Sequence, residues 1–109
     1  MTIRIATDFT ETPGARHRNA GNCSGEEFRE AILEPKFLEA NGKGEKLIID
    51  LDGGYGYPTS FLDEAFGGLS RKYGADNVLS ALVFVSRDEP SLPNEIKGYI
   101  ASDNGIKQH

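Results

Sequence analysis

The sequence predicts a small α/β domain in which helices pack on a mostly parallel sheet. Two apolar runs, 47–51 and 78–86, are typical of buried strands because branched and aromatic side chains dominate them. Segments with apolar residues at helical spacing lie before, between and after these runs. Strands that alternate with helices pair in parallel through right-handed crossovers, so we expect the order β-α-β-α-β-α. The 109 residues are enough for one such domain, which would span 1–109.

The first strand is expected from about Thr2 to Thr7, where apolar and polar side chains alternate, and it should lie at an edge of the sheet. A helix should begin after Ser24, which suits the N-cap position because two glutamates fill the first turn. The predicted inner stripe of this helix is Phe28, Ala31, Ile32 and Leu38.

Pro35 lies inside this helical pattern. Because proline lacks an amide proton and clashes with the preceding turn, we expect it to kink the helix or to restart it as a short second piece. Two glycines that follow Asn41, Gly42 and Gly44, should then end the segment.

The stretch 47–74 predicts a strand, a glycine-rich turn and a capped helix. The strand is expected to be covered on both faces because its apolar run is almost unbroken. Thr59 or Ser60 can serve as the N-cap, with Asp63 completing a capping box and Glu64 adding charge to the first turn. Gly74 is the expected stop. The predicted inner positions are Leu62, Ala65, Phe66, Leu69 and Tyr73.

The last two elements are a strand and a helix. The run 78–86 predicts a second buried strand. A helix is expected from about Leu92 to Ala101, with Leu92, Ile96 and Ile100 on one face and the pair Asn104 and Gly105 closing it.

Bulk properties exclude several classes of function. A formal charge of -5 and a pI near 5.0 argue against a general nucleic-acid binder. No apolar run approaches the roughly 20 residues that span a bilayer, and no signal peptide follows Met1, so no membrane attachment is expected. The single Cys23 fits a reducing compartment, and we expect a cytoplasmic protein without a cofactor or a metal site.

The first candidate site is the start of the helix that follows the glycine-rich turn. A phosphoryl group on Thr59 or Ser60 would meet free backbone amides and the positive end of the helix dipole. Plain N-capping explains the two hydroxyls equally well. Tyr55 and Tyr57 in the turn are candidate interface anchors, or they pack over the sheet edge.

Two further sets of residues could carry chemistry. Asp50 and Asp52 resemble the strand-end Asp-x-Asp-Gly of haloacid-dehalogenase-type phosphotransferases, so a small Mg²⁺-dependent phosphate-handling enzyme is an alternative. Solvated or turn-forming aspartates are the simpler interpretation. Arg16 and Arg18 with Ser24 could hold a nucleotide phosphate or another anion, or they belong to a mobile surface loop.

Gly67 and Gly68 lie within the second predicted helix, where glycine destabilises by about 1 kcal/mol relative to alanine. Either this helix packs closely on the sheet, or it offers a smooth face to a partner's backbone.

Three segments together resemble a STAS-like family of unknown function: SGEEFREAIL, LIIDLDG and SFLDEAFGGL. This family is related in pattern to the STAS domains of anti-sigma-factor antagonists. In those antagonists an Asp-Ser pair precedes the helix, and the partner kinase phosphorylates the Ser. Here Pro58 stands at the Asp position, Thr59 at the phosphoacceptor position and Ser60 after it.

The resemblance implies a single STAS-like domain without catalytic residues. Such a domain docks on another protein, often an ATP-binding kinase-like regulator. We therefore expect an interaction domain, with phosphorylation at Thr59 or Ser60 as a subsidiary hypothesis. The expected contact residues are Tyr55, Tyr57, Thr59, Ser60, Asp63 and Glu64.

Overall fold

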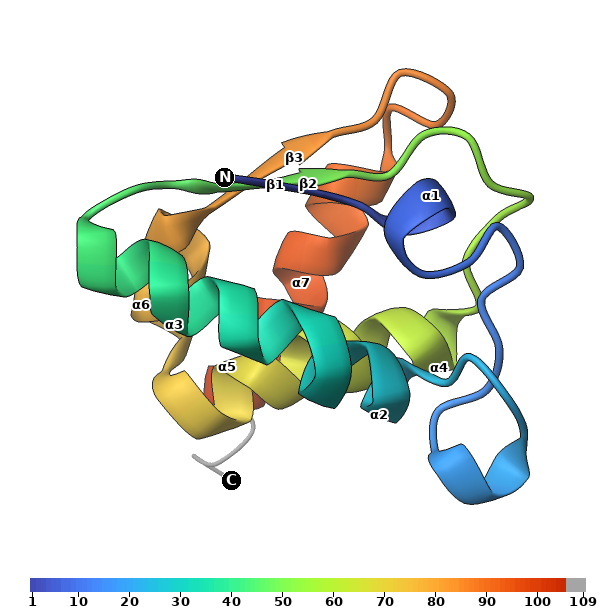
Figure 1. The fold of residues 1–109 in the computed structure, drawn as a ribbon. Coiled ribbons are helices and arrows are strands. Elements are labelled where there is room, and N and C mark those ends of the chain that lie inside the picture. Colours follow the sequence, from blue (N-terminus) through green and yellow to red (C-terminus); the bar gives the residue numbers. More distant parts are fainter. Residues whose placement is uncertain (106–109) are drawn as a thin grey trace.

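A three-stranded parallel sheet forms one layer of the molecule, at the top of Figure 1. The computed structural model describes residues 1–105. The strands lie in the order β1 (Thr2–Arg4), β2 (Leu47–Asp50) and β3 (Leu82–Val85), and both neighbouring pairs are parallel. This confirms the predicted α/β class.

Helices fill the connections between and after the strands. Two sets of helical segments run on without a break in helical backbone, and we call them the first long helix (residues 25–43) and the second long helix (residues 59–73). In chain order the segments are α1 (Ile5–Asp8), the 3-10 helix η1 (Arg18–Ala20), α2 (Gly25–Phe28), the π-helix η2 (Arg29–Leu33), α3 (Glu34–Lys43), α4 (Thr59–Leu62), the π-helix η3 (Asp63–Gly67), α5 (Gly68–Tyr73), α6 (Ala75–Ala81) and α7 (Leu92–Gly105).

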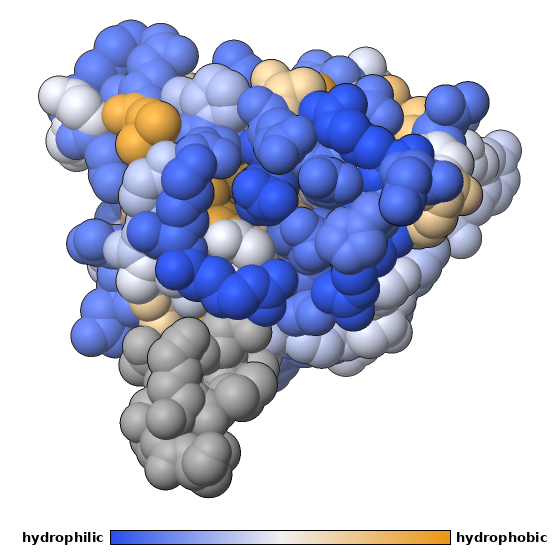
Figure 2. Space-filling model, turned by 90° about the horizontal axis from the view of Figure 1, so that it is seen from below, coloured by the Kyte–Doolittle hydropathy of each residue, from blue (hydrophilic) through white to orange (hydrophobic). Residues whose placement is uncertain are grey.

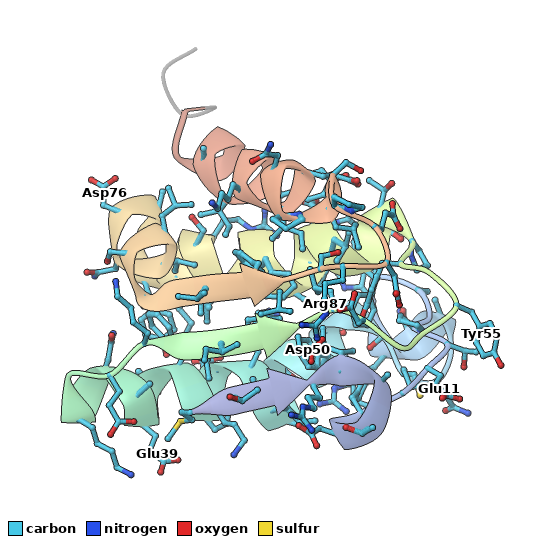
Figure 3. The ribbon with its side chains drawn as sticks, turned by 90° about the horizontal axis from the view of Figure 1, so that it is seen from above. Glu11, Glu39, Asp50, Tyr55, Asp76 and Arg87 are labelled. Atoms are coloured by element: carbon cyan, nitrogen blue, oxygen red, sulfur yellow. The ribbon has the colours of Figure 1, made fainter. Side chains whose placement is uncertain are left out.

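All the described helices lie on one side of the sheet, below it in Figure 1. Seen from above, the strands lie in front of the helices, and no described segment covers them (Figure 3). The prediction of a strand covered on both faces is therefore wrong: β2 alternates between buried and half-buried residues, with Ile49 fully buried and Ile48 only partly. The opposite surface, over the helices, is mostly hydrophilic with separate apolar spots (Figure 2).

The core lies between the sheet and the two long helices. Phenylalanine rings join the two long helices to each other and to the sheet. Phe28 and Phe61, one in each long helix, stack with ring centroids 5.8 Å apart, and Phe66 meets Phe84 of β3 edge-on at 5.6 Å. All five predicted inner positions of the second long helix face this core, four of them fully buried and Tyr73 partly.

The predicted inner stripe of the first long helix is partly wrong. Phe28 is buried, but Ala31 and Leu38 are exposed and Ile32 is only half-buried. The π-helix η2 causes this, because a π turn adds a residue and shifts the apolar phase from the spacing of a regular helix. The buried positions are instead Phe28, Leu33, Phe37 and Ala40.

Pro35 does not interrupt the helical backbone. It lies in the first turn of α3, directly after the π-helix, where its missing amide is tolerated. Gly44 adopts a left-handed conformation (φ 67°) at the end of α3, which confirms the predicted stop.

Three other predicted boundaries differ from the structure. The first strand ends at Arg4, and Ile5 begins the short helix α1. Residues 78–81 belong to α6 rather than to a strand, because Val78 and Ala81 bury one helical face. The last helix reaches Gly105 instead of ending at Ala101, although its predicted buried face is confirmed.

In the part of the chain that the structure describes, helices are too short or too polar to cross a membrane.

Candidate functional site

The loop between β2 and α4, which we call the docking loop (residues 52–58), displays a tyrosine from a fixed backbone. Its glycines 53 and 56 have φ values of 95° and 123°, in the left-handed region that favours glycine. The Tyr55 amide donates to the Glu11 carbonyl at 2.9 Å, which ties the tip of the loop to the segment after α1. The Tyr55 side chain is 84% exposed and points away from the molecule near Glu11 (Figure 3).

Tyr57 supports the docking loop from inside. Its hydroxyl donates to the Leu51 carbonyl at 2.9 Å, and its ring lies 6.2 Å from that of Phe61. Burial raises the pKa of Tyr57 to about 12, and the charges of Asp50 and Asp52 add to this shift. The hydroxyl therefore stays protonated and keeps donating at neutral pH. Of the two predicted anchors, only Tyr55 is displayed to solvent.

The two strand-end aspartates bind backbone and arginine groups at the carboxyl end of the sheet. Oδ1 of Asp52 accepts from the amides of Arg87 and Asp88, at 2.8 and 2.9 Å, and Oδ2 lies 3.2 Å from Nε of Arg87. These interactions, with the Asp88 amide as the largest contributor, lower the pKa of Asp52. In the opposite direction, Oδ2 of Asp88 accepts from the Gly53 amide at 3.1 Å. These hydrogen bonds tie the docking loop to the loop that follows β3, and we call this set of contacts between residues 52–53 and 87–88 the Asp52 clasp.

Asp50 contacts this clasp, accepting from the Asp52 amide at 3.0 Å and lying 3.7 Å from Nε of Arg4. Among residues 1–101, whose side chains the structure describes, no group of three His, Cys, Asp or Glu side chains is placed to hold a metal ion. The enzyme alternative stays a prediction, but the carboxylate of Asp52 already has structural partners.

The predicted capping role of Thr59 and Ser60 is wrong. Pro58 is the N-cap, with an extended backbone (φ -61°, ψ 143°), and no side chain caps this helix. Thr59 and Ser60 are therefore the first two helical residues, and the predicted capping box with Asp63 is not formed. Thr59 is exposed and lies within hydrogen-bonding reach of the Tyr99 hydroxyl of α7.

Asp63 and Glu64, two of the predicted contact residues, bind arginines of the same chain. Oδ2 of Asp63 accepts from Nη1 of Arg16 at 2.7 Å. Glu64 is only 8% exposed, and its Oε2 lies 2.9 Å from Nη2 of Arg29 in the first long helix. The Arg29 side chain is itself only 15% exposed, so this pair is largely desolvated.

The two long helices approach closely at this pair, and their two π-helices, η2 and η3, pack against each other. A Cβ atom on Gly25 would lie 2.6 Å from the Phe61 carbonyl oxygen, and one on Gly68 would lie 2.7 Å from Nε of Arg29. Gly68 therefore packs against the neighbouring long helix, and not against the sheet, which was the first of the two expected alternatives.

A second polar contact joins the middle of the first long helix to the carboxyl end of the second. Oε2 of Glu34 accepts from Nζ of Lys72 at 2.6 Å and from the Tyr73 hydroxyl at 2.5 Å. Both bonds lower the pKa of Glu34, with Lys72 as the larger cause. Sequence reasoning missed Arg29 and Glu34. A charged residue at an inward helical position was the available signal, but its partner lies 35 or more residues away.

The predicted anion-binding residues lie close together, but each has a partner in the fold. Arg16 binds Asp63, as described, and Nε of Arg18 lies 3.1 Å from Oε1 of Glu30. Ser24 is fully buried, and its hydroxyl accepts from the Glu27 amide at 3.0 Å, which confirms it as an N-cap. Anion binding stays a prediction that this carboxylate-rich geometry does not favour.

Comparison with known proteins identifies a family. The family described as a STAS-like domain of unknown function matches residues 24–92, more than half of the chain. The matched range includes both long helices, β2, the docking loop and β3. No curated protein and no solved structure matches the sequence significantly.

Proposed function

Because this chain belongs to the family of STAS-like domains of unknown function, we propose that it is a cytoplasmic, non-enzymatic interaction domain that docks on another protein. Its contact surface is the docking loop together with the exposed start of the second long helix. Tyr55 is the central contact, and Thr59 and Ser60 at the start of the helix are the other two.

One observation carries this proposal: a tyrosine that is 84% exposed stands on a loop whose backbone is already fixed. Tyrosine is enriched among the residues that dominate binding energy, because its ring buries a large area and its hydroxyl finds a partner. The Glu11 bond and the Asp52 clasp order the loop before binding. A preordered loop loses less conformational entropy when a partner binds.

The remaining predicted contact residues support this surface through contacts within the fold. Tyr57 fixes the loop from the core side, and Asp63 and Glu64 hold the helix in place through Arg16 and Arg29. The proposed surface is therefore smaller than the predicted one. Its direct contacts are Tyr55, Thr59 and Ser60.

The resemblance to antagonist STAS domains favours an ATP-binding kinase-like regulator as the partner. Regulation at Thr59 or Ser60 is supported by their position in the first turn of the helix, where a phosphate would meet unpaired backbone amides. Exposure of Thr59 makes it the better acceptor of the two.

A photo-crosslinker placed at position 55 in the native host tests the docking surface. We expect one recurrent protein adduct, identified by mass spectrometry. The matched control is the same crosslinker at Leu38, which is 48% exposed on α3. With the identified protein purified, Tyr55→Ala should weaken binding roughly tenfold or more, whereas Leu38→Ala should leave affinity unchanged. Equal adducts at both positions would contradict the proposal.

A separate experiment tests regulation. The purified partner and ATP are incubated with the chain, and phosphate is mapped by mass spectrometry. Phosphate on Thr59 or Ser60, absent from a Thr59→Ala/Ser60→Ala variant, supports the switch. Modification only elsewhere removes the switch but leaves the docking surface intact.

A further inference from the structure

The two edges of the sheet are protected to different degrees. The Met1 carbonyl accepts from the Ile48 amide, so Met1 points toward β2. Because peptide groups alternate in direction along a strand, those of Arg4 point outward. Oδ2 of Asp8 accepts from the Arg4 amide at 2.8 Å. The β1 edge is therefore short, charged and capped by a side chain.

The β3 edge has no such protection. The Val85 carbonyl accepts from the Leu51 amide, so Val85 points toward β2 and Phe84 points its amide and carbonyl outward. No other strand in residues 1–105 pairs with this side. All four residues of β3, Leu82–Val85, are apolar and uncharged. Exposed apolar edge strands pair readily with another strand.

We propose that a second copy of this chain pairs with β3 in antiparallel orientation. The outward peptide groups determine the register: Phe84 exchanges both hydrogen bonds with Phe84 of the second copy, across a twofold axis. Val83 then lies opposite Val85 of the second copy on the uncovered face of the sheet. The two three-stranded sheets form one continuous sheet of six strands.

Charge favours a second copy in this register. Lys46 lies at the amino end of β3, where its Nζ donates to the Ser80 carbonyl. Asp88 and Glu89 are exposed just beyond the carboxyl end, and Nε of Arg87, which precedes them, lies 3.2 Å from Oδ2 of Asp52 in its own copy. Antiparallel pairing brings each end beside the opposite end of the other strand, so Lys46 of one copy approaches Asp88 of the other, twice.

Cysteine pairing tests the register directly. Disulfides need Cβ atoms about 3.5–4.5 Å apart, which directly opposite residues approach and diagonal ones, at about 7–8 Å, do not. In a Cys23→Ser background, Val83→Cys protein is mixed with Val85→Cys protein and oxidised. We expect covalent dimers in the mixture and few in either protein alone. Equal cross-linking in the separate samples would overturn this register.

The mass in solution tests the dimer itself. Light scattering during gel filtration at 0.15 M salt, where repulsion between the two acidic copies is screened beyond about 8 Å, should show a dimer that dissociates on dilution. Val83→Lys, at an exposed position, should raise the dissociation constant roughly tenfold or more. Thr2→Lys, on the same face but at the β1 edge, should leave it unchanged. A monomer at every concentration, with no cross-linking, would overturn the proposal and leave the edge to a different protein.

Discussion

The docking loop and the second turn of the second long helix, which carries Glu64, lie close together in the sequence, yet they face different surroundings. Tyr55 in the loop is 84% exposed, whereas Glu64 in the helix is 8% exposed. Polar backbone bonds to Glu11 and Asp88 fix the loop. A desolvated side-chain pair with Arg29 fixes the helix.

The sequence predicted a single contact surface that included both Tyr55 and Glu64. In the structure Tyr55 is available for binding, whereas Glu64 stabilises the fold. Charged residues near a helix start are usually solvated, but Glu64 faces a second helix that carries a complementary arginine. The surface available to a partner is thereby limited to the loop and the first turn of the helix. Changes at Glu64 should alter stability, and changes at Tyr55 should alter binding.

Removing Glu64 should give the largest loss of stability. Glu64→Ala leaves Arg29 buried without its closest partner, although Glu34 still lies 3.8 Å from Nη1 of Arg29. We expect the free energy of unfolding in urea to fall by about 3 kcal/mol. Glu39→Ala is the control, because the exposed pair of Glu39 with Lys43 should contribute less than about 0.5 kcal/mol. Equal effects of the two substitutions would contradict the account.

Widening the contact between the long helices should have the next largest effect. Gly25→Ala places a Cβ atom 2.6 Å from the Phe61 carbonyl oxygen, a backbone atom that cannot easily move. The expected loss is about 1–3 kcal/mol in urea unfolding. Gly42→Ala, whose added Cβ atom would meet nothing within 4 Å apart from the backbone of its own helix, should be neutral or stabilise by up to about 1 kcal/mol. A neutral Gly25→Ala would show that the helices can separate without loss of stability.

Loosening the Asp52 clasp should have a smaller, pH-dependent effect. The folded pKa of Asp52 lies below its ordinary value of 3.8, so its contribution to stability is present above that pH and is lost as pH falls through the folded pKa. Asp52→Asn should therefore be less stable than the native chain at neutral pH. The gap should close in strong acid, as measured by unfolding across a pH series. A gap that is constant with pH would argue against this carboxylate as the cause.

Tyr55→Ala should change stability least. The side chain makes almost no contact within the fold, so the free energy of unfolding should shift by less than about 0.5 kcal/mol. A larger loss would show that Tyr55 supports the fold instead of presenting a binding surface.

Local patterns were sufficient to predict much of the fold. The strand at 47–50, the cap at Ser24, the stop at Gly44 and the inner face of the second long helix follow from short-range periodicity and capping. The inner stripe of the first long helix could not be predicted in the same way. A π turn shifts the phase by one residue, and a regular helical period does not anticipate it.

The site was less predictable because its roles depend on long-range partners. The exposure of Tyr55 and the burial of Glu64 depend on where Glu11 and Arg29 lie in space, far from both in sequence. The Asp52 clasp likewise joins residues 35 or 36 apart. Residue type and spacing identified the docking loop and the helix after it as the candidate site, but they did not show which residues are exposed and which stabilise the fold.

Hydrogen exchange of the chain alone and with its cross-linked partner protein, purified, tests the central claim most directly. The account predicts slower exchange on binding at residues 53–57 and 59–60, with no change in the π-helix η2 (residues 29–33) of the first long helix. Slower exchange in the first long helix, with none in the docking loop, would contradict it.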